Sequence, residues 1–118
     1  MSDEEMYKAN KEISEYYGLE NRLCITMEEA AELIQACNKI RRAYDEDKLF
    51  ITQGEFENRL DNFVEESADV LFCITSVCYL LCIDESSIED AVKQKLERTL
   101  SRIEEEKKKI EEELNDSK

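Results

Sequence analysis

Apolar positions recur at helical spacing in four stretches of the chain, and no stretch alternates between apolar and polar residues as a strand would. The first predicted helix covers residues 4–17, and Gly18 is expected to end it. Its apolar face holds Met6, Ala9, Ile13 and Tyr17. We interpret Tyr16 and Tyr17 as residues that pack this helix on a bundle, rather than as a wall for base stacking.

The second predicted helix covers residues 27–44. Thr26 is the expected N-cap, because Glu29 follows three residues later as a capping box requires. The apolar face of this helix holds Met27, Ala30, Ala31, Ile34, Cys37 and Ile40. The periodicity is lost over residues 45–55, which are therefore predicted to form a connection.

The third predicted helix starts near Thr52 or Gly54 and extends through residues 56–83. Its second half, residues 70–83, is the most hydrophobic segment of the chain. A helix that is apolar on all sides is a buried one, so this segment is expected to form the centre of the core. It is too short to cross a bilayer, which takes about 20 apolar residues.

The fourth predicted helix is capped by Asp84 or by Ser86, and Glu89 would complete a capping box with Ser86. Its apolar face holds Ile88, Val92, Leu96, Leu100 and Ile103. From about residue 104 the chain becomes a charged helical tail that is expected to fray. Residues 1–118 are thus predicted to be a single all-α domain, an antiparallel four-helix bundle.

Composition narrows the function classes. The chain has 118 residues with no proline, two glycines and a formal net charge of −14. So negative a surface should repel nucleic acids and anionic membranes, yet it permits small anionic substrates where metal ions neutralise the site. The absence of histidine excludes histidine-based catalysis and the usual zinc and di-iron ligand sets. Five cysteines without a CxxC pair, and no signal peptide, predict a protein of the reducing cytoplasm.

Two acidic motifs are the candidates for chemistry. Glu66 and Asp69 lie three residues apart, which places both on one face of the third helix, and Glu29 and Glu32 repeat that spacing on the second. Packed helices lie about 8–10 Å apart, so the two pairs can meet across the interface. Oxygen ligands without histidine select Mg²⁺, or Mn²⁺, over Zn²⁺. One such motif alone would be better interpreted as a solvated helix face.

Cationic side chains supply a second part of the pattern. Lys95, Thr99 and Arg102 follow the i, i+4, i+7 spacing on the fourth helix, with Arg98 adjacent. Lys39 lies on the same line of the second helix as Glu28 and Glu32. These side chains are either surface charges that balance acidic neighbours or contacts to the phosphates of a nucleotide. With a carboxylate-bound metal, the matching reaction is metal-assisted hydrolysis of a phosphoanhydride. No P-loop sequence is present.

The order E-E-x-x-E followed by E-x-x-D resembles the signature of the MazG-like all-α NTP pyrophosphatases. Here it reads Glu28-Glu29-x-x-Glu32 and Glu66-x-x-Asp69, within the strings M-E-E-A-A-E-L-I-Q-A and V-E-E-S-A-D-V-L-F. The likeness extends from about residue 26 to residue 102. The family's Lys-x-x-x-Asn-x-x-Arg pattern is matched by Lys95, Thr99 and Arg102, with threonine in place of asparagine.

The resemblance implies a Mg²⁺-dependent enzyme that cleaves a nucleoside triphosphate between its α and β phosphates, giving the monophosphate and pyrophosphate. By motif position, the metal ligands would be Glu29, Glu32, Glu66 and Asp69. Glu28 or Glu65 would be a further ligand or would orient the attacking water. The substrate-binding residues would be Lys39, Lys95, Thr99 and Arg102. Members of the family assemble as dimers or tetramers, which implies a homodimer or homotetramer here.

The alternative is a non-catalytic helical module, for oligomerisation or regulation, whose acidic face binds a basic partner. Composition and charge favour it as strongly as they favour an enzyme. The two hypotheses differ in one requirement. Catalysis needs the four carboxylates to converge on one site, whereas the module needs only a continuous acidic surface.

Overall fold

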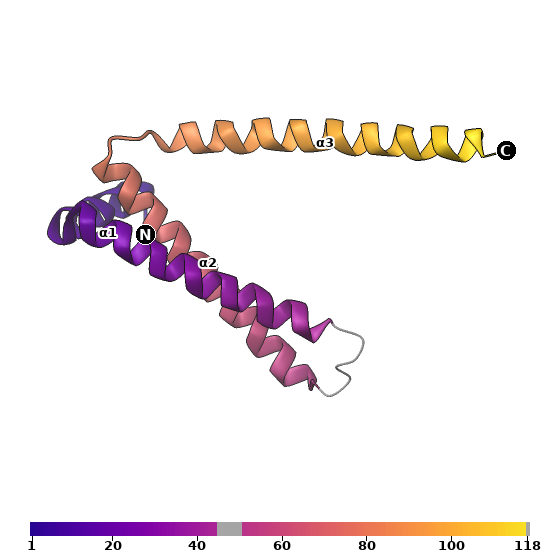
Figure 1. The fold of residues 1–118 in the computed structure, drawn as a ribbon. Coiled ribbons are helices and arrows are strands. Elements are labelled where there is room, and N and C mark those ends of the chain that lie inside the picture. Colours follow the sequence, from indigo (N-terminus) through magenta and orange to yellow (C-terminus); the bar gives the residue numbers. More distant parts are fainter. Residues whose placement is uncertain (45–50, 118) are drawn as a thin grey trace. The chain divides into compact units, whose positions relative to one another are not determined.

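The computed structural model describes residues 1–44 and 51–117, and its elements are α1 (Asp3–Ala43), α2 (Gln53–Leu80) and α3 (Glu85–Asp116) (Figure 1). The predicted all-α class is confirmed. The predicted connection falls partly on residues 45–50, which lie outside the described residues. The chain divides into two compact units, Met1–Ile83 and Asp84–Lys118. The predictions of a single domain and of a four-helix bundle completed by oligomerisation stay predictions.

Helix α1 is two helical arms joined at a break. Ser2 caps its start in a capping box with Glu5, and Gly18 interrupts it with φ +82° and ψ 167°. That combination is open essentially only to glycine. The predicted stop at Gly18 is therefore confirmed. We call residues 3–17 the first arm and residues 19–43 the second arm.

The predicted N-cap at Thr26 is wrong. The second arm is already helical before this residue, and the Thr26 hydroxyl donates to the Arg22 carbonyl at 2.6 Å, one turn back. A threonine within a helix commonly makes this bond. The break at Gly18 starts the helix earlier, so a cap at Thr26 has no free N–H groups to serve.

The ends of α2 explain its length. Thr52 is the N-cap and forms a capping box with Glu55, which confirms the start near Thr52. At the other end, Cys82 takes a positive φ of 55° and the Ile83 N–H donates to the Cys78 carbonyl at 2.9 Å. These are features of a Schellman motif. The helix thus ends at Leu80, three residues before the predicted Ile83.

Helices α1 and α2 lie side by side (Figure 1) and their contacts pair early residues of one with late residues of the other, so the second arm is antiparallel to α2. The core between them is small. Its buried residues are Ser14, Arg22, Ala36, Cys73, Ser76 and Cys78. In the single chain the apolar run is not buried on all sides, since Leu71 remains 64% exposed and Phe72 45% exposed. Among the described residues of this unit, α1 is the element that packs against α2.

Helix α3 forms the second unit. Asp84 is its N-cap and accepts a hydrogen bond from the Ser86 N–H at 3.0 Å, so the alternative cap at Ser86 is not used. The helix continues to Asp116, which makes the charged tail helical, and all its described residues are exposed. No helix within the described ranges has an apolar stretch long enough to cross a membrane.

Candidate metal centre

Three carboxylates from two helices converge near the middle of the α1–α2 interface. Glu29 comes from the second arm, and Glu66 and Asp69 come from α2. One oxygen atom of each lies within 4.8 Å of the others. The spacing of three residues sets Glu66 and Asp69 on one face of α2, and the antiparallel packing brings Glu29 opposite. We call these three residues the acidic cluster.

Two members of the acidic cluster, Glu29 and Glu66, hold their protons unusually tightly. Desolvation and the charges of Glu32 and Asp69 raise the pKa of Glu29 to about 7. The pKa of Glu66 is also raised, by desolvation first and then by Glu32 and Asp69. Like charges that are partly withdrawn from water disfavour ionisation. Without a cation, the cluster is therefore electrostatically unfavourable at neutral pH.

Two oxygen atoms of the cluster are suited to hold such a cation. Oε2 of Glu29 and Oε2 of Glu66 are buried, and neither has a hydrogen-bond partner among the described residues. A buried carboxylate oxygen normally has a partner, so these two orphaned atoms are consistent with a ligand role. The donors are all hard oxygens, which fits Mg²⁺ or Mn²⁺ and not a softer metal.

The other acidic residues of the two motifs lie around the cluster. Glu32 is exposed, and its carboxyl group lies close enough to raise the pKa of both Glu29 and Glu66. Glu28 and Glu65 are also exposed, and the charge of Glu65 contributes to the raised pKa of Glu66. None of these three belongs to the group of converging oxygen atoms. Their assignment as ligands or water-orienting groups stays a prediction.

The predicted substrate-binding cations are distributed over both units. Lys39 is exposed on the second arm, where its carbonyl accepts a hydrogen bond from Arg59 Nη1 at 2.6 Å. On α3, the Thr99 hydroxyl donates to the Lys95 carbonyl at 2.7 Å, so it is turned back onto its own helix.

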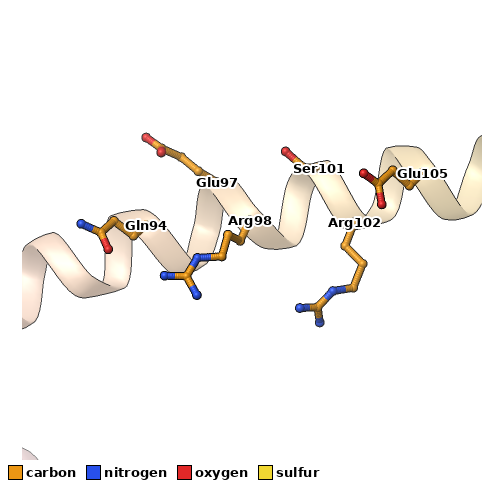
Figure 2. Close-up of a pocket in the computed structure, with 6 residues that line it drawn as sticks. All are labelled: Gln94, Glu97, Arg98, Ser101, Arg102 and Glu105. Carbon is orange, nitrogen blue, oxygen red and sulfur yellow. The ribbon is translucent and has the colours of Figure 1, made fainter.

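Arg98 and Arg102 line a shallow hollow on α3, and their guanidinium groups lie on the same side of the helix (Figure 2). Its other lining residues are Gln94, Glu97, Ser101 and Glu105. The hollow therefore pairs Arg102 with Arg98 rather than with Lys95 and Thr99. Phosphate contacts by these α3 residues stay a prediction.

A buried arginine beside the cluster is the residue that sequence analysis missed. Arg22 is 6% exposed, and its Nε donates to Ser76 Oγ at 3.2 Å while its Nη2 donates to Cys73 Sγ at 3.6 Å. Its guanidinium carbon lies 5.9 Å from the Tyr17 ring centroid and 5.1 Å from that of Phe72. The available signal was its position seven residues before Glu29, on the same helix face.

Comparison with known families places most of the chain within a family model. A family model described as phosphoribosyl-ATP pyrophosphohydrolase matches residues 2–96, which is most of the chain. That family lies within the MazG-like all-α NTP pyrophosphatase superfamily, so the resemblance found in the sequence is confirmed. Searches of curated proteins and of solved structures gave no match.

Proposed function

Because the chain belongs to the phosphoribosyl-ATP pyrophosphohydrolase family, we propose that it is a Mg²⁺-dependent enzyme that cleaves the α–β phosphoanhydride of a nucleoside triphosphate. Family membership supports pyrophosphohydrolase activity on a nucleotide. The observation that carries the rest of the proposal is the convergence of three carboxylate oxygens within 4.8 Å, two of them on residues that also carry an orphaned buried oxygen.

The proposed reaction consumes one water molecule. The bond between the bridging oxygen and one phosphorus atom breaks, and the water oxygen forms a new bond to that phosphorus. The products are a nucleoside monophosphate and pyrophosphate. When bound, a divalent cation would neutralise phosphate oxygens and acidify a water molecule. Glu29, Glu66 and Asp69 would hold it, joined by Glu32, and Glu28 or Glu65 would orient the attacking water.

The substrate is proposed at the level of its chemical class. Phosphoribosyl-ATP, the substrate in the name of the matching family, is a triphosphate and is one candidate. Ordinary NTPs and dNTPs are others, since all carry the same scissile bond. Lys39, Lys95, Thr99 and Arg102 are proposed to contact the phosphates. The enzyme is proposed to work in the cytoplasm as a homodimer or homotetramer.

The first prediction tests this function. Purified protein with Mg²⁺ should release pyrophosphate, and not free phosphate, from at least one member of a panel of NTPs, dNTPs and phosphoribosyl-ATP. Glu66→Gln keeps the size of the side chain but removes a charge from the proposed ligand set. We expect it to lower kcat by about a hundredfold or more.

Asp69→Asn and Asp61→Asn form a matched pair on α2. Asp69→Asn removes a carboxylate of the acidic cluster, and its control Asp61→Asn removes an exposed carboxylate of the same helix. Asp61→Asn should keep wild-type kinetics, and Asp69→Asn should lose activity with its helical content intact. An absence of pyrophosphate release from the whole panel, or full activity of Glu66→Gln, would return the chain to the acidic helical module.

A further inference from the structure

Arg22 carries a buried positive charge whose partners are all neutral. Its guanidinium contacts the Ser76 hydroxyl, the Cys73 thiol and the faces of two aromatic rings. Within residues 1–44 and 51–117 no carboxylate lies within ion-pair distance of it. Burying a charge is costly unless an opposite charge compensates it. The arrangement therefore lacks a counter-ion.

The position of Arg22 places this charge on the same helix–helix interface as the acidic cluster. Arg22 precedes Glu29 by seven residues, a rise of about 10 Å along the second arm. On α2, Cys73 follows Asp69 by four residues, so it lies one turn from the cluster, and its sulfur accepts the Arg22 hydrogen bond. Along the interface between the two helices, the carboxylates of the acidic cluster are thus followed by the guanidinium group of Arg22.

The polar contacts around Arg22 fix its orientation. Ser76 Oγ accepts from Arg22 Nε and also lies 2.5 Å from Ser14 Oγ, which in turn donates to Asn10 Oδ1 at 3.3 Å. Ser14 and Ser76 are fully buried. Among the described residues Nη1 of Arg22 makes no hydrogen bond. Ser76 and Cys73 therefore fix the guanidinium group through Nε and Nη2, and the N–H groups of Nη1 are available to an anion.

We propose that Arg22 is a substrate-binding residue that pairs with a phosphate group of the nucleotide next to the one held at the acidic cluster. This inference rests on the proposed function, because it assumes that the cluster and its cation hold one part of a polyphosphate. A polyphosphate has anionic oxygens on each phosphorus atom, so successive groups can meet the cation and then the arginine. Guanidinium groups bind such oxygens in a bidentate way.

The test compares Arg22→Met with wild type. Methionine replaces the arginine stem with an apolar chain and removes the buried charge, so the fold should survive and its stability should be unchanged or higher. The dissociation constants of an α,β-methylene triphosphate analogue and of inorganic pyrophosphate, both with Mg²⁺, should rise by about ten- to a hundredfold. Arg41→Met, on an exposed residue of the same helix, should leave both constants unchanged.

A second variant covers the case in which Arg22→Met does not fold. Arg22→Lys keeps the charge but loses the planar donor pair, so it should bind the analogue several-fold more weakly than wild type, with its melting temperature monitored in parallel. Wild-type dissociation constants in whichever variant folds would overturn the inference. A purely structural role would move the melting temperature and leave these constants unchanged.

The inference and the proposed function fail separately. If wild-type protein hydrolyses nucleotides while Arg22→Met keeps the wild-type KM and dissociation constants, Arg22 is not a phosphate contact and the function stands. If wild-type protein hydrolyses nothing but binds pyrophosphate through Arg22, the anion site stands and the proposed function falls.

Discussion

At the residue scale, Glu29 and Glu66 of the acidic cluster are carboxyl groups that retain protons when no cation compensates them. The pKa of Glu29 is raised to about 7 and that of Glu66 is raised too, both chiefly by desolvation. A carboxyl group whose pKa is higher in the folded state than in the unfolded state binds more protons when folded. Folding is therefore favoured at the pH values where that proton is present.

The second prediction follows from the raised pKa of Glu29, which makes folding more favourable at lower pH. Metal-free protein should be more stable at pH 5 than at pH 8, because the contribution of Glu29 is complete below its unfolded pKa of 4.5 and is lost as the pH rises through about 7. Urea unfolding midpoints at several pH values measure it. Glu29→Gln should flatten the profile over this window, whereas Asp61→Asn should not. A wild-type slope in Glu29→Gln would contradict the assigned cause.

The same scale shows what the sequence could and could not indicate about the site. The spacing of Glu66 and Asp69, repeated at Glu29, predicted carboxylates on facing helices, because helical periodicity converts spacing into direction. Arg22 could not be found in that way. Its position seven residues before Glu29 places it on the same helix face, but in a chain that is 39% charged that spacing indicates neither its burial nor its neutral partners.

At the element scale, local chemistry decides where the helices begin and end. The roles of Gly18 and Thr52 were predictable from the sequence. A lone glycine is typical of a helix end, and a threonine followed three residues later by glutamate is typical of a helix start. Thr26 has the same local pattern as Thr52 and yet lies inside a helix. The difference arises upstream, at the break at Gly18, and a local motif does not contain that information.

The third prediction compares the two glycines of the chain. Gly18→Ala should destabilise the fold by about 1–3 kcal/mol, since its φ of +82° and ψ of 167° are strained for any residue with a Cβ. Gly54→Ala, in the first turn of α2, should instead stabilise it by about 0.4–1 kcal/mol. A Cβ at either position meets no atom within 4 Å, so a clash explains neither result. Urea denaturation of the two variants should shift in opposite directions, and equal shifts would refute the backbone explanation.

At the scale of the whole molecule, apolar side chains are left on the surface of both units. Leu71 is 64% exposed on α2. On α3 the apolar stripe predicted from the sequence is exposed along its length, and it holds Ile88, Val92, Leu96, Leu100 and Ile103. Contiguous apolar surface of this kind is typical of protein interfaces. It is consistent with the homodimer or homotetramer that we propose.

The fourth prediction concerns this assembly. Light scattering should give a mass that is a multiple of 13.9 kDa, and the melting temperature should rise with protein concentration. Leu96→Lys places a charge in the α3 stripe and should lower the assembled mass. Glu97→Lys, at the adjacent residue, introduces the same side chain outside the stripe and should preserve that mass. A monomer at all concentrations would contradict the proposal.

The break at Gly18 also determines how local stability is distributed along α2. The late part of that helix meets both arms: Asn10 donates to the Thr75 carbonyl, Tyr79 donates to Glu15, and Arg22 reaches Ser76. Nearer the start of α2, the hydrogen bond that joins it to α1 among the described residues is the one from Arg59 to the Lys39 carbonyl. Segments with fewer tertiary contacts open at lower free energy. The start of α2 should therefore unfold locally while its end stays closed, and Arg22 lies at the persistent end.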